Sequence, residues 1–303
     1  MQHLLIALVC LAILIKSAEV FIDQVSAIAK KFKISSFIVG FVLISFGTAL
    51  PDLVISTYSA SQGDTSFAIS TTMGSAFVNI SLLAGILGLI TKYKLQENDL
   101  EKNIPVTIAA TVAFIIIVLL FGGRLTWVGG IIAIGIYIFA TLFLKKQNTV
   151  TEHKEKTKLN PLFLVLAFVA LALSGKYASE SFLRFADYLK IQDSMVGFFV
   201  VGVGISVPEL VASLQVLKKG NLELSLGNLL GAFLINILIA PSIASFFTPL
   251  NYQPFVFDLL YILFSLIMFL FFALLGKEYY ISKKEGIGLI LIYILFVVLQ
   301  ILL

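Results

Sequence analysis

The sequence is poor in the residues that build disulfides and soft metal sites. It contains one cysteine, Cys10, and two histidines among 303 residues. A single cysteine cannot form an intrachain disulfide, and zinc and copper sites draw on Cys and His side chains. The sequence therefore excludes an intrachain disulfide and a cysteine-built metal centre.

Charged residues are scarce as well. Only 13% of the residues are charged, whereas 59% are hydrophobic, far from the usage of soluble domains. Several apolar runs reach the roughly 20 residues that a bilayer-spanning helix requires, which indicates a polytopic protein of the lipid bilayer. The net charge of +4 does not indicate a nucleic-acid partner, because the lysines lie between the apolar runs. No protein partner is evident either.

The apolar runs predict an all-α membrane protein with ten transmembrane helices. Residues 4–15 resemble a signal-peptide core, but the preceding residues lack Lys and Arg and no small-residue cleavage site follows, so we expect this segment to remain as the first helix. The predicted helices cover residues 2–29, 35–61, 66–91, 104–122, 126–145, 161–186, 194–218, 224–247, 254–276 and 286–303.

The two halves of the chain share a repeated motif. A shift of 157 residues takes Asp52 to Glu209 and, without a gap, several glycines, a proline and an asparagine to identical residues. The identical pairs include Gly40 and Gly197, Gly47 and Gly204, Pro51 and Pro208, Leu53 and Leu210, Ser56 and Ser213, Gly74 and Gly231, and Asn79 and Asn236. We therefore expect a first five-helix repeat at residues 1–145, a cytoplasmic linker at 146–160, and a second five-helix repeat at 161–303.

Five helices per repeat is an odd number, so the second copy should cross the membrane in the opposite sense to the first. With the loop that contains Lys30 to Lys33 inside, the linker lysines and most other loop lysines also lie inside. The positive-inside rule then predicts a multi-pass protein of the cell membrane with both termini extracytoplasmic.

The repeated motif places an acid directly after a proline. Pro51 and Pro208 lack an N–H and free a carbonyl of the preceding turn, so both helices should break at the bilayer midplane, where broken helices line protein cavities. An ionised Asp52 or Glu209 there costs several kcal/mol unless it is paired or liganded. Two such acids near one another favour a shared cation or protonation of one of them.

The groups around the two acids offer oxygen and no sulfur or imidazole. Carboxylates, hydroxyls and carbonyls in this mixture are the ligands of hard cations such as Ca²⁺. Ser and Asn in membrane helices also form simple interhelical hydrogen bonds, which is the preferred interpretation for Ser56 and Ser213. The oxygen-bearing side chains are Thr48, Ser56, Ser75, Asn79, Ser206, Ser213 and Asn236.

The motifs resemble those of a known family. GTALPD (residues 47–52) with MGSAFVN (73–79), and GISVPE (204–209) with GNLLGAFLIN (227–236), are similar to the two signature repeats of the calcium/cation antiporter superfamily, and the sodium/calcium exchanger branch is the most similar. The resemblance implies a transporter rather than an enzyme, built from ten helices in two inverted halves. It implies no cofactor beyond the transported Ca²⁺ and Na⁺ or H⁺.

Position by position, the resemblance implies a ligand set for these ions. Asp52 and Glu209 would hold Ca²⁺, helped by the backbone oxygens of Thr48 and Ile205, and Asn79 and Asn236 would close the centre. The hydroxyls of Thr48, Ser206 and Ser75 and the carbonyls of Ser45 and Gly202 would contribute to the sites of the monovalent ion.

The chain also departs from the family pattern. Where the family usually has Glu, Ser, Thr and Ser, this sequence has Asp52, Ala49, Ile205 and Ala232. The side of the site formed by Ile205 and Ala232 has therefore lost two hydroxyl ligands, and we expect weaker Na⁺ binding there.

Several functions stay open at this point. The leading hypothesis is exchange of Ca²⁺ for Na⁺ by alternating access, with H⁺ as the second choice of counter-ion and Mg²⁺ as another divalent substrate. An intramembrane aspartyl protease is disfavoured, because both acids directly follow helix-breaking prolines and no G-x-G-D-like motif is present. A passive cation channel differs from an exchanger by flux that persists without a counter-ion gradient.

Overall fold

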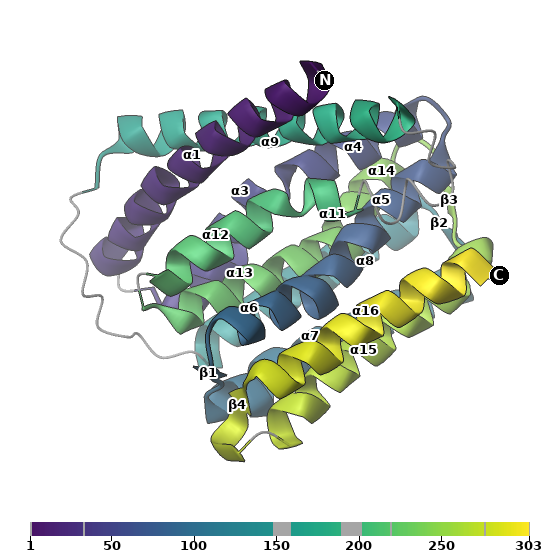
Figure 1. Cartoon of the computed structure of the whole chain (residues 1–303). Helices are drawn as coiled ribbons and strands as arrows, with labels where there is room; N and C mark the ends of the chain where they lie inside the picture. Colours follow the sequence, from purple (N-terminus) through teal and green to yellow (C-terminus); the bar gives the residue numbers. More distant parts are fainter. Residues whose placement is uncertain are drawn as a thin grey trace. The chain divides into compact units, whose positions relative to one another are not determined.

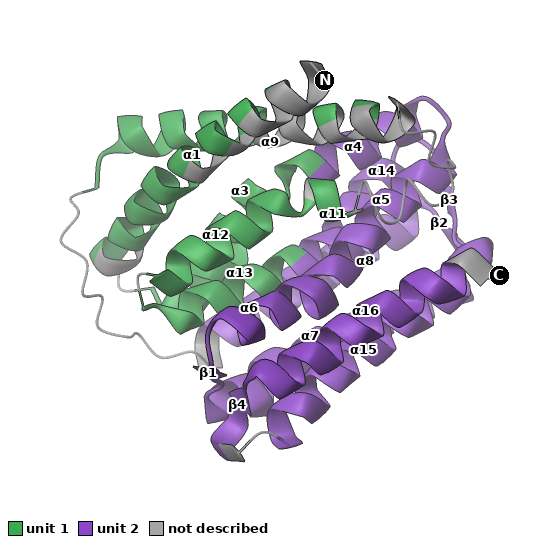
Figure 2. Ribbon diagram, in the orientation of Figure 1, with its two compact units in different colours: residues 1–51, 148–232 green, residues 52–147, 233–303 purple. Residues whose placement is uncertain are grey.

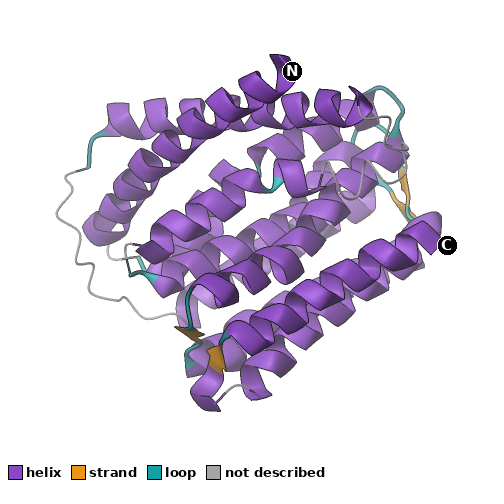
Figure 3. Cartoon of the chain, in the orientation of Figure 1, coloured by secondary structure: helices purple, strands orange, loops and turns teal. Residues whose placement is uncertain are grey.

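The computed structural model describes residues 2–32, 34–147, 159–188, 202–218, 220–275 and 277–302. Each of the ten predicted helical segments overlaps helix in this part of the chain, and the seventh is described from Gly202 onward (Figure 1). Apart from four two-residue strands, the regular structure of the described residues is helical (Figure 3). The predicted all-α class is confirmed.

The chain forms two compact units, and each takes residues from both sequence halves (Figure 2). Unit 1 contains residues 1–51 and 148–232, and unit 2 contains residues 52–147 and 233–303. The predicted boundaries near residues 145 and 161 follow the sequence repeat. The repeat divides the chain into two consecutive halves, whereas each compact unit combines residues of both halves. Most of the predicted linker lies outside the described residues.

Unit 1 is built around two long helices. Its α1 packs along α9 and against α12, using an apolar stripe of Ala18, Phe21, Ile22 and Val25 at the spacing of one helix face. Phe21 meets the Phe168 ring of α9 with the ring centroids 5.8 Å apart. The elements are α1 (Gln2–Phe32), α2 (Ser36–Ile38), the π-helical η1 (Val39–Ile44), α3 (Ser45–Thr48), α9 (Pro161–Tyr188), α11 (Gly202–Ile205), α12 (Val207–Lys218) and most of α13 (Leu222–Leu234).

Glycines bring two segments of unit 1 into backbone contact. A Cβ built on Gly40 of η1 would lie 2.2 Å from the Leu224 carbonyl oxygen of α13, and one on Gly227 would lie 2.2 Å from the Phe37 carbonyl oxygen. No side chain fits at these distances, so glycine is required for this approach. The contact sets α13, which carries part of the second motif, directly against the helix that leads to the first.

Unit 2 contains the remaining helices. Phe77 is at the centre of an aromatic cluster, with its ring centroid 4.4 Å from that of Phe296 and 5.4 Å from that of Tyr293. The cluster packs the last helix against the first motif. The elements are α4 (Leu50–Ser61, from Asp52), α5 (Thr65–Phe77), η2 (Val78–Leu83), α6 (Ala84–Ile90), β1 (Tyr93–Lys94), η3 (Asp99–Asn103), α7 (Ile104–Leu120), β2 (Arg124–Leu125), α8 (Trp127–Gln147), η5 (Ile235–Ile239), α14 (Ala240–Ser245), β3 (Leu250–Asn251), η6 (Gln253–Phe255), α15 (Val256–Leu275), η7 (Lys277–Tyr279), β4 (Tyr280–Ile281) and α16 (Lys283–Leu302).

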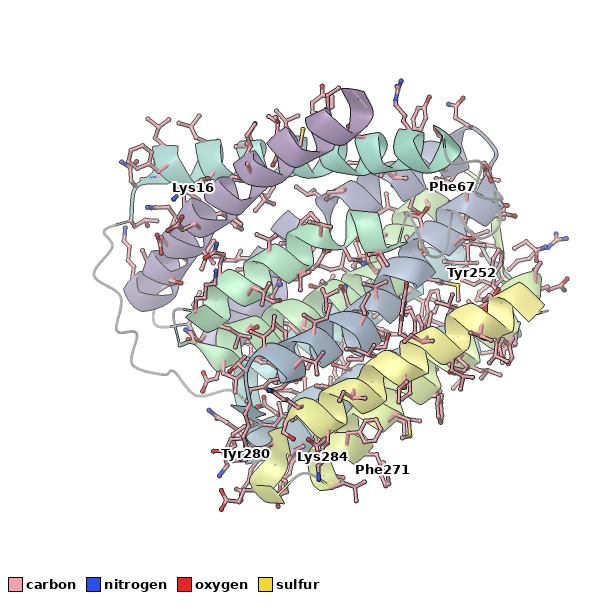
Figure 4. The ribbon with its side chains drawn as sticks, viewed as in Figure 1. Lys16, Phe67, Tyr252, Phe271, Tyr280 and Lys284 are labelled. Atoms are coloured by element: carbon pink, nitrogen blue, oxygen red, sulfur yellow. The ribbon has the colours of Figure 1, made fainter. Side chains whose placement is uncertain are left out.

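The short strands of unit 2 pair between the two halves of the sequence. Antiparallel β1 pairs with β4, and antiparallel β2 pairs with β3, so each pair joins one strand from each half. The 157-residue shift takes β1 onto β3. Because β3 precedes α15 and β4 follows it, β3 and the β1–β4 pair lie about 30 Å apart, at opposite ends of this 20-residue helix. Tyr252 and Tyr280 mark the two ends in Figure 4. An inverted repeat predicts this arrangement.

Within the described residues, five helices are long and apolar enough to cross a membrane, or six when the bent pair Ser36–Thr48 and Leu50–Ser61 counts as one span. In the spans that carry the second parts of the motifs, Thr65–Ile90 and Leu222–Ser245, 78% and 94% of an apolar 18-residue stretch is buried, whereas in Trp127–Lys145 and Gln253–Leu275 the share is 33%. The protein is therefore a helical membrane protein whose motif helices are the buried ones.

Two of the predicted helices extend further toward their N-terminal ends in the structure. The predicted start at residue 104 agrees with α7, which the π-helical η3 extends back to Asp99, and the helix predicted from residue 286 begins at Lys283. In each case an acid of the first turn accepts a hydrogen bond from the backbone N–H three residues earlier: Asp99 from Gln96 at 2.8 Å, and Glu285 from Ser282 at 2.9 Å. Such polar turns carry no apolar signal, so the hydropathy pattern missed them.

Candidate ion-binding site

Both motif helices break at equivalent positions. The first breaks at Ala49, between α3 and α4, with a bend of 50°, and the second breaks at Ser206, between α11 and α12. The shift of 157 residues takes Ala49 to Ser206. Each break lies two residues before a proline, as Pro51 and Pro208 predict, and each acid lies in the first turn of the helix that follows.

In unit 2, Asp52 is fully buried and receives hydrogen bonds on both carboxylate oxygens. The Ser75 hydroxyl of α5 donates to Oδ1 at 2.7 Å, and the Asn236 Nδ2 of η5 donates to Oδ2 at 2.9 Å. These donors stabilise a carboxylate far from water. Three helices from both sequence halves thus meet at one acid.

Asn79 and Asn236 lie at equivalent positions within π-helical turns, η2 and η5. Both side chains are fully buried. Among the described residues, no hydrogen-bond partner exists for either amide atom of Asn79 or for Oδ1 of Asn236. A buried amide without a partner costs about 1–3 kcal/mol, and an oxygen of this kind is a ligand for a hard cation. The residues present therefore fit the ion class that the sequence predicts.

In unit 1, Glu209 and Thr48 are fully buried and are linked through Asn228 of α13. The Thr48 hydroxyl contacts Asn228 Oδ1 at 3.3 Å, and Asn228 Nδ2 points at the Glu209 backbone carbonyl at 3.5 Å and at the Ser213 hydroxyl at 3.0 Å. The Ser206 hydroxyl, also buried, has no hydrogen-bond partner in the described part of the chain.

The remaining predicted ligands also belong to unit 1. The Ser45 carbonyl accepts hydrogen bonds from the Ala49 N–H at 2.9 Å and from the Thr48 hydroxyl at 3.2 Å, and the Ser45 hydroxyl donates to the Phe41 carbonyl. Gly202 and Ile205 form the ends of α11, and the Ile205 side chain lies outside the described residues.

The predicted ligands thus fall into two sets, each described within its own unit. The set in unit 2 contains Asp52, Ser75, Asn79 and Asn236, and the set in unit 1 contains Ser45, Thr48, Gly202, Ile205, Ser206 and Glu209. Hydrogen bonds join Asp52, Ser75 and Asn236. The proximity of Asp52 and Glu209 stays a prediction.

Within the described residues no group of three or more His, Cys, Asp and Glu side chains is gathered where it could hold a metal ion. An ion bound by these residues would therefore draw on neutral oxygens in addition to carboxylates. Asn228 is the residue that the sequence analysis missed. Its signal was available, because it directly follows Gly227 in the second motif and its counterpart in the first copy, Thr71, is also polar.

Comparison with known proteins assigns the chain to a family. The family model described as sodium/calcium exchanger protein matches residues 2–146 and 159–302. The chain belongs to the sodium/calcium exchanger family. Members of this family are membrane transporters, so the protein is not an enzyme, and the protease alternative is excluded.

Similar proteins cover almost the whole chain. Sodium/calcium exchanger MaX1 of Methanosarcina acetivorans is 26% identical over 98% of this chain and 97% of its own length. Inner membrane protein YrbG of Escherichia coli is 24% identical over 94% of this chain and 91% of its own. A solved structure of the sodium-calcium exchanger NCX_Mj has a TM-score of 0.81 at 23% identity, covering 97% of this chain and 96% of that one, which shows a shared fold.

Proposed function

We propose that this exchanger-family protein moves Ca²⁺ across the membrane in exchange for Na⁺, by alternating access around Asp52 and Glu209. One observation carries the proposal: two acids are buried at equivalent positions, each just after the break in its helix, and nearby elements carry Asn and Ser oxygens that have no hydrogen-bond partner among the described residues. A buried acid in a membrane needs a cation or a proton.

The ligand roles follow the chemistry of the groups. The carboxylates of Asp52 and Glu209, with the backbone oxygens of Thr48 and Ile205, hold Ca²⁺. Asn79 and Asn236 add neutral oxygen at the centre. Na⁺ uses weaker ligands, namely the hydroxyls of Ser75, Thr48 and Ser206 and the carbonyls of Ser45 and Gly202.

The proposed architecture has ten transmembrane helices in two inverted repeats of five, with a cytoplasmic linker at residues 146–160. Both termini lie outside the cytoplasm. The strands of unit 2 support the inversion, since β1 and its equivalent β3 lie at opposite ends of α15. Cysteine-scanning with an impermeant thiol reagent on a variant lacking Cys10 tests the orientation.

H⁺ is the second candidate for the counter-ion. The observation that favours it is the absence of hydroxyls at Ile205 and Ala232, where the equivalent residues are Thr48 and Ser75. A proton needs one acceptor rather than a full shell of ligands, so this loss affects H⁺ less than Na⁺. Mg²⁺ is the corresponding alternative for the divalent ion, because the shorter Asp52 leaves more room for ion-bound water.

The deciding experiment measures radiolabelled Ca²⁺ uptake into proteoliposomes under imposed Na⁺, K⁺ or H⁺ gradients. We expect uptake to be driven by an outward Na⁺ gradient and to be reduced by Asp52→Asn. Uptake driven by H⁺ alone would replace Na⁺ with H⁺ as the counter-ion. Uptake that persists with no gradient would indicate a channel, and competition by Mg²⁺ at equal concentration would broaden the divalent substrate.

A further inference from the structure

Asn228 is a fully buried side chain that bridges three parts of unit 1. It lies on α13, its Nδ2 donates to the Ser213 hydroxyl of α12 at 3.0 Å, and the same nitrogen faces the Glu209 carbonyl oxygen at 3.5 Å. Its Oδ1 lies 3.3 Å from the Thr48 hydroxyl, at the end of α3. One amide therefore contacts the helix end before the first break and the helix start after the second.

Within the described residues, the equivalent residue of the first copy, Thr71, makes no such bridge. The Thr71 hydroxyl donates to the Phe67 carbonyl at 2.8 Å, one turn back in its own helix. The framework around the two positions is otherwise shared: Ser56 donates to the Ala68 carbonyl at 3.2 Å, and Ser225 donates to the Ser213 carbonyl at 3.3 Å, which links the same two positions in both copies. In the described part of the chain, the bridge by Asn228 thus occurs in the second copy and not in the first.

The bridge affects the direction in which the Thr48 hydroxyl donates its proton. A hydroxyl has one proton and two lone pairs, and Thr48 has two acceptors within reach, the Ser45 carbonyl at 3.2 Å and Asn228 Oδ1 at 3.3 Å. When the proton points at Asn228, the Ser45 carbonyl keeps one lone pair for an ion. When it points at Ser45, that carbonyl accepts two hydrogen bonds, from Thr48 and from the Ala49 N–H.

We propose that Asn228 is a positioning residue that sets the ion affinity of the Thr48 side of the site by drawing the Thr48 hydroxyl proton away from the Ser45 carbonyl. Its amide nitrogen fixes the side chain against Ser213 and the backbone of Glu209, so that Oδ1 faces Thr48. Asn228 itself contacts no ion. This inference rests on the proposed function, because it assigns Thr48 and Ser45 to the monovalent-ion sites.

The test uses the Na⁺ dependence of Ca²⁺ exchange in proteoliposomes of the full chain. Asn228→Ala removes the acceptor, and Asn228→Thr installs the residue of the first copy, Thr71, whose hydroxyl bonds within its own helix. We expect the apparent Na⁺ affinity to fall about tenfold in both, as the loss of one hydrogen bond of ordinary strength predicts. The exchange rate at saturating Na⁺ should change less than twofold, because the ligands themselves remain.

A double-mutant cycle with Thr48→Val separates positioning from general packing. If Asn228 acts through the Thr48 hydroxyl, Asn228→Thr on a Thr48→Val background should cause no further loss of Na⁺ affinity. Additive losses would overturn the inference.

The matched control is Asn221→Ala at the start of the same helix. Asn221 accepts from the Leu224 N–H at 3.0 Å and donates to the Ser36 hydroxyl at 3.3 Å, which are structural contacts. This variant should lower the thermal unfolding temperature and leave the Na⁺ dependence unchanged. If the Asn228 variants behave in the same way, the positioning role is wrong, whereas the proposed Ca²⁺ exchange function is not contradicted. A wild-type protein that exchanges no Ca²⁺ for Na⁺ would instead refute the proposed function, and the inference with it.

Discussion

The two copies of the motif keep the same acid position and differ in the groups that surround it. Around Asp52, side chains of Ser75 and Asn236 donate directly to the carboxylate. Around Glu209, the position equivalent to Ser75 is Ala232, and the neighbouring amide of Asn228 meets the backbone carbonyl of the acid instead. Both copies thus keep the broken helix, its acid and the asparagines Asn79 and Asn236, and they differ at Ser75 and Ala232 and at Thr71 and Asn228. Differences in ion preference between the two halves should be sought in these neighbours.

Neutralising either acid should have the largest effect and should act on both halves alike. Asp52→Asn and Glu209→Gln each remove one of the two charges proposed to balance Ca²⁺, so we expect Na⁺-driven Ca²⁺ uptake to fall by about 100-fold or more. Size-exclusion profiles in detergent should stay those of the wild type. Wild-type uptake in either variant would show that the two copies are not equivalent and that the mutated acid is not needed for transport.

Ser75→Ala should make the first half resemble the second. The change deletes the 2.7 Å hydrogen bond to Asp52, and losing a hydrogen bond to a charged group costs about 1.5–3 kcal/mol, or roughly 10- to 100-fold in apparent ion affinity. Ion titrations of uptake measure this. Ser70→Ala is the matched control on the same helix, since Ser70 donates to the Ser66 carbonyl at the surface. Equal losses in both variants would contradict a specific role for Ser75.

A third comparison concerns the effect on stability of replacing a glycine of the motif helices and a glycine elsewhere. Gly40→Ala places a Cβ against the Leu224 carbonyl, and we expect overpacking to lower stability by about 1–3 kcal/mol. Gly135→Ala on α8 meets no atom within 4 Å and should leave stability unchanged or raise it by about 0.5–1 kcal/mol. Thermal unfolding in detergent, followed by size exclusion, measures both. A Gly40→Ala protein as stable as the wild type would show that α13 moves aside easily.

Restoring the missing hydroxyls should have the smallest effect. Ile205→Thr with Ala232→Ser gives the second half the residue types of Thr48 and Ser75, so we expect the Na⁺ dependence of Ca²⁺ exchange to become steeper. The Hill coefficient of uptake against Na⁺ concentration is the measurement. A wild type that is already steep, with no gain in the double variant, would show that other residues supply the ligands.

Much of the fold could be predicted from the sequence because its main signals are local. Apolar runs long enough for a bilayer identified the helices, and a proline removes a hydrogen bond wherever it stands, so Pro51 and Pro208 located both breaks to within two residues. The acids followed from their position after these prolines.

The contacts across helices could not be predicted in the same way. The bridge from Asn228 to Thr48 depends on α13 lying against the first motif helix, which in turn depends on Gly40 and Gly227. The packing of the helices determines these contacts, and the spacing of residues in the sequence does not predict how the helices pack. The strands are two residues long, too short for an alternating pattern, and the division into two compact units cuts across the repeat.

The π-helical turns η2 and η5 have a consequence for the history of the gene. Such a turn holds one residue more than an α-helical turn, so it behaves as a single-residue insertion within a helix. Val78, the first residue of η2, maps by the 157-residue shift onto Ile235, the first residue of η5. The simplest account is one insertion in an ancestral half-length chain, copied when that chain was duplicated and fused. Because both copies keep the turn at the same place, the 157-residue shift runs without a gap from Gly40 and Gly197 to Asn79 and Asn236, which lie inside the two turns.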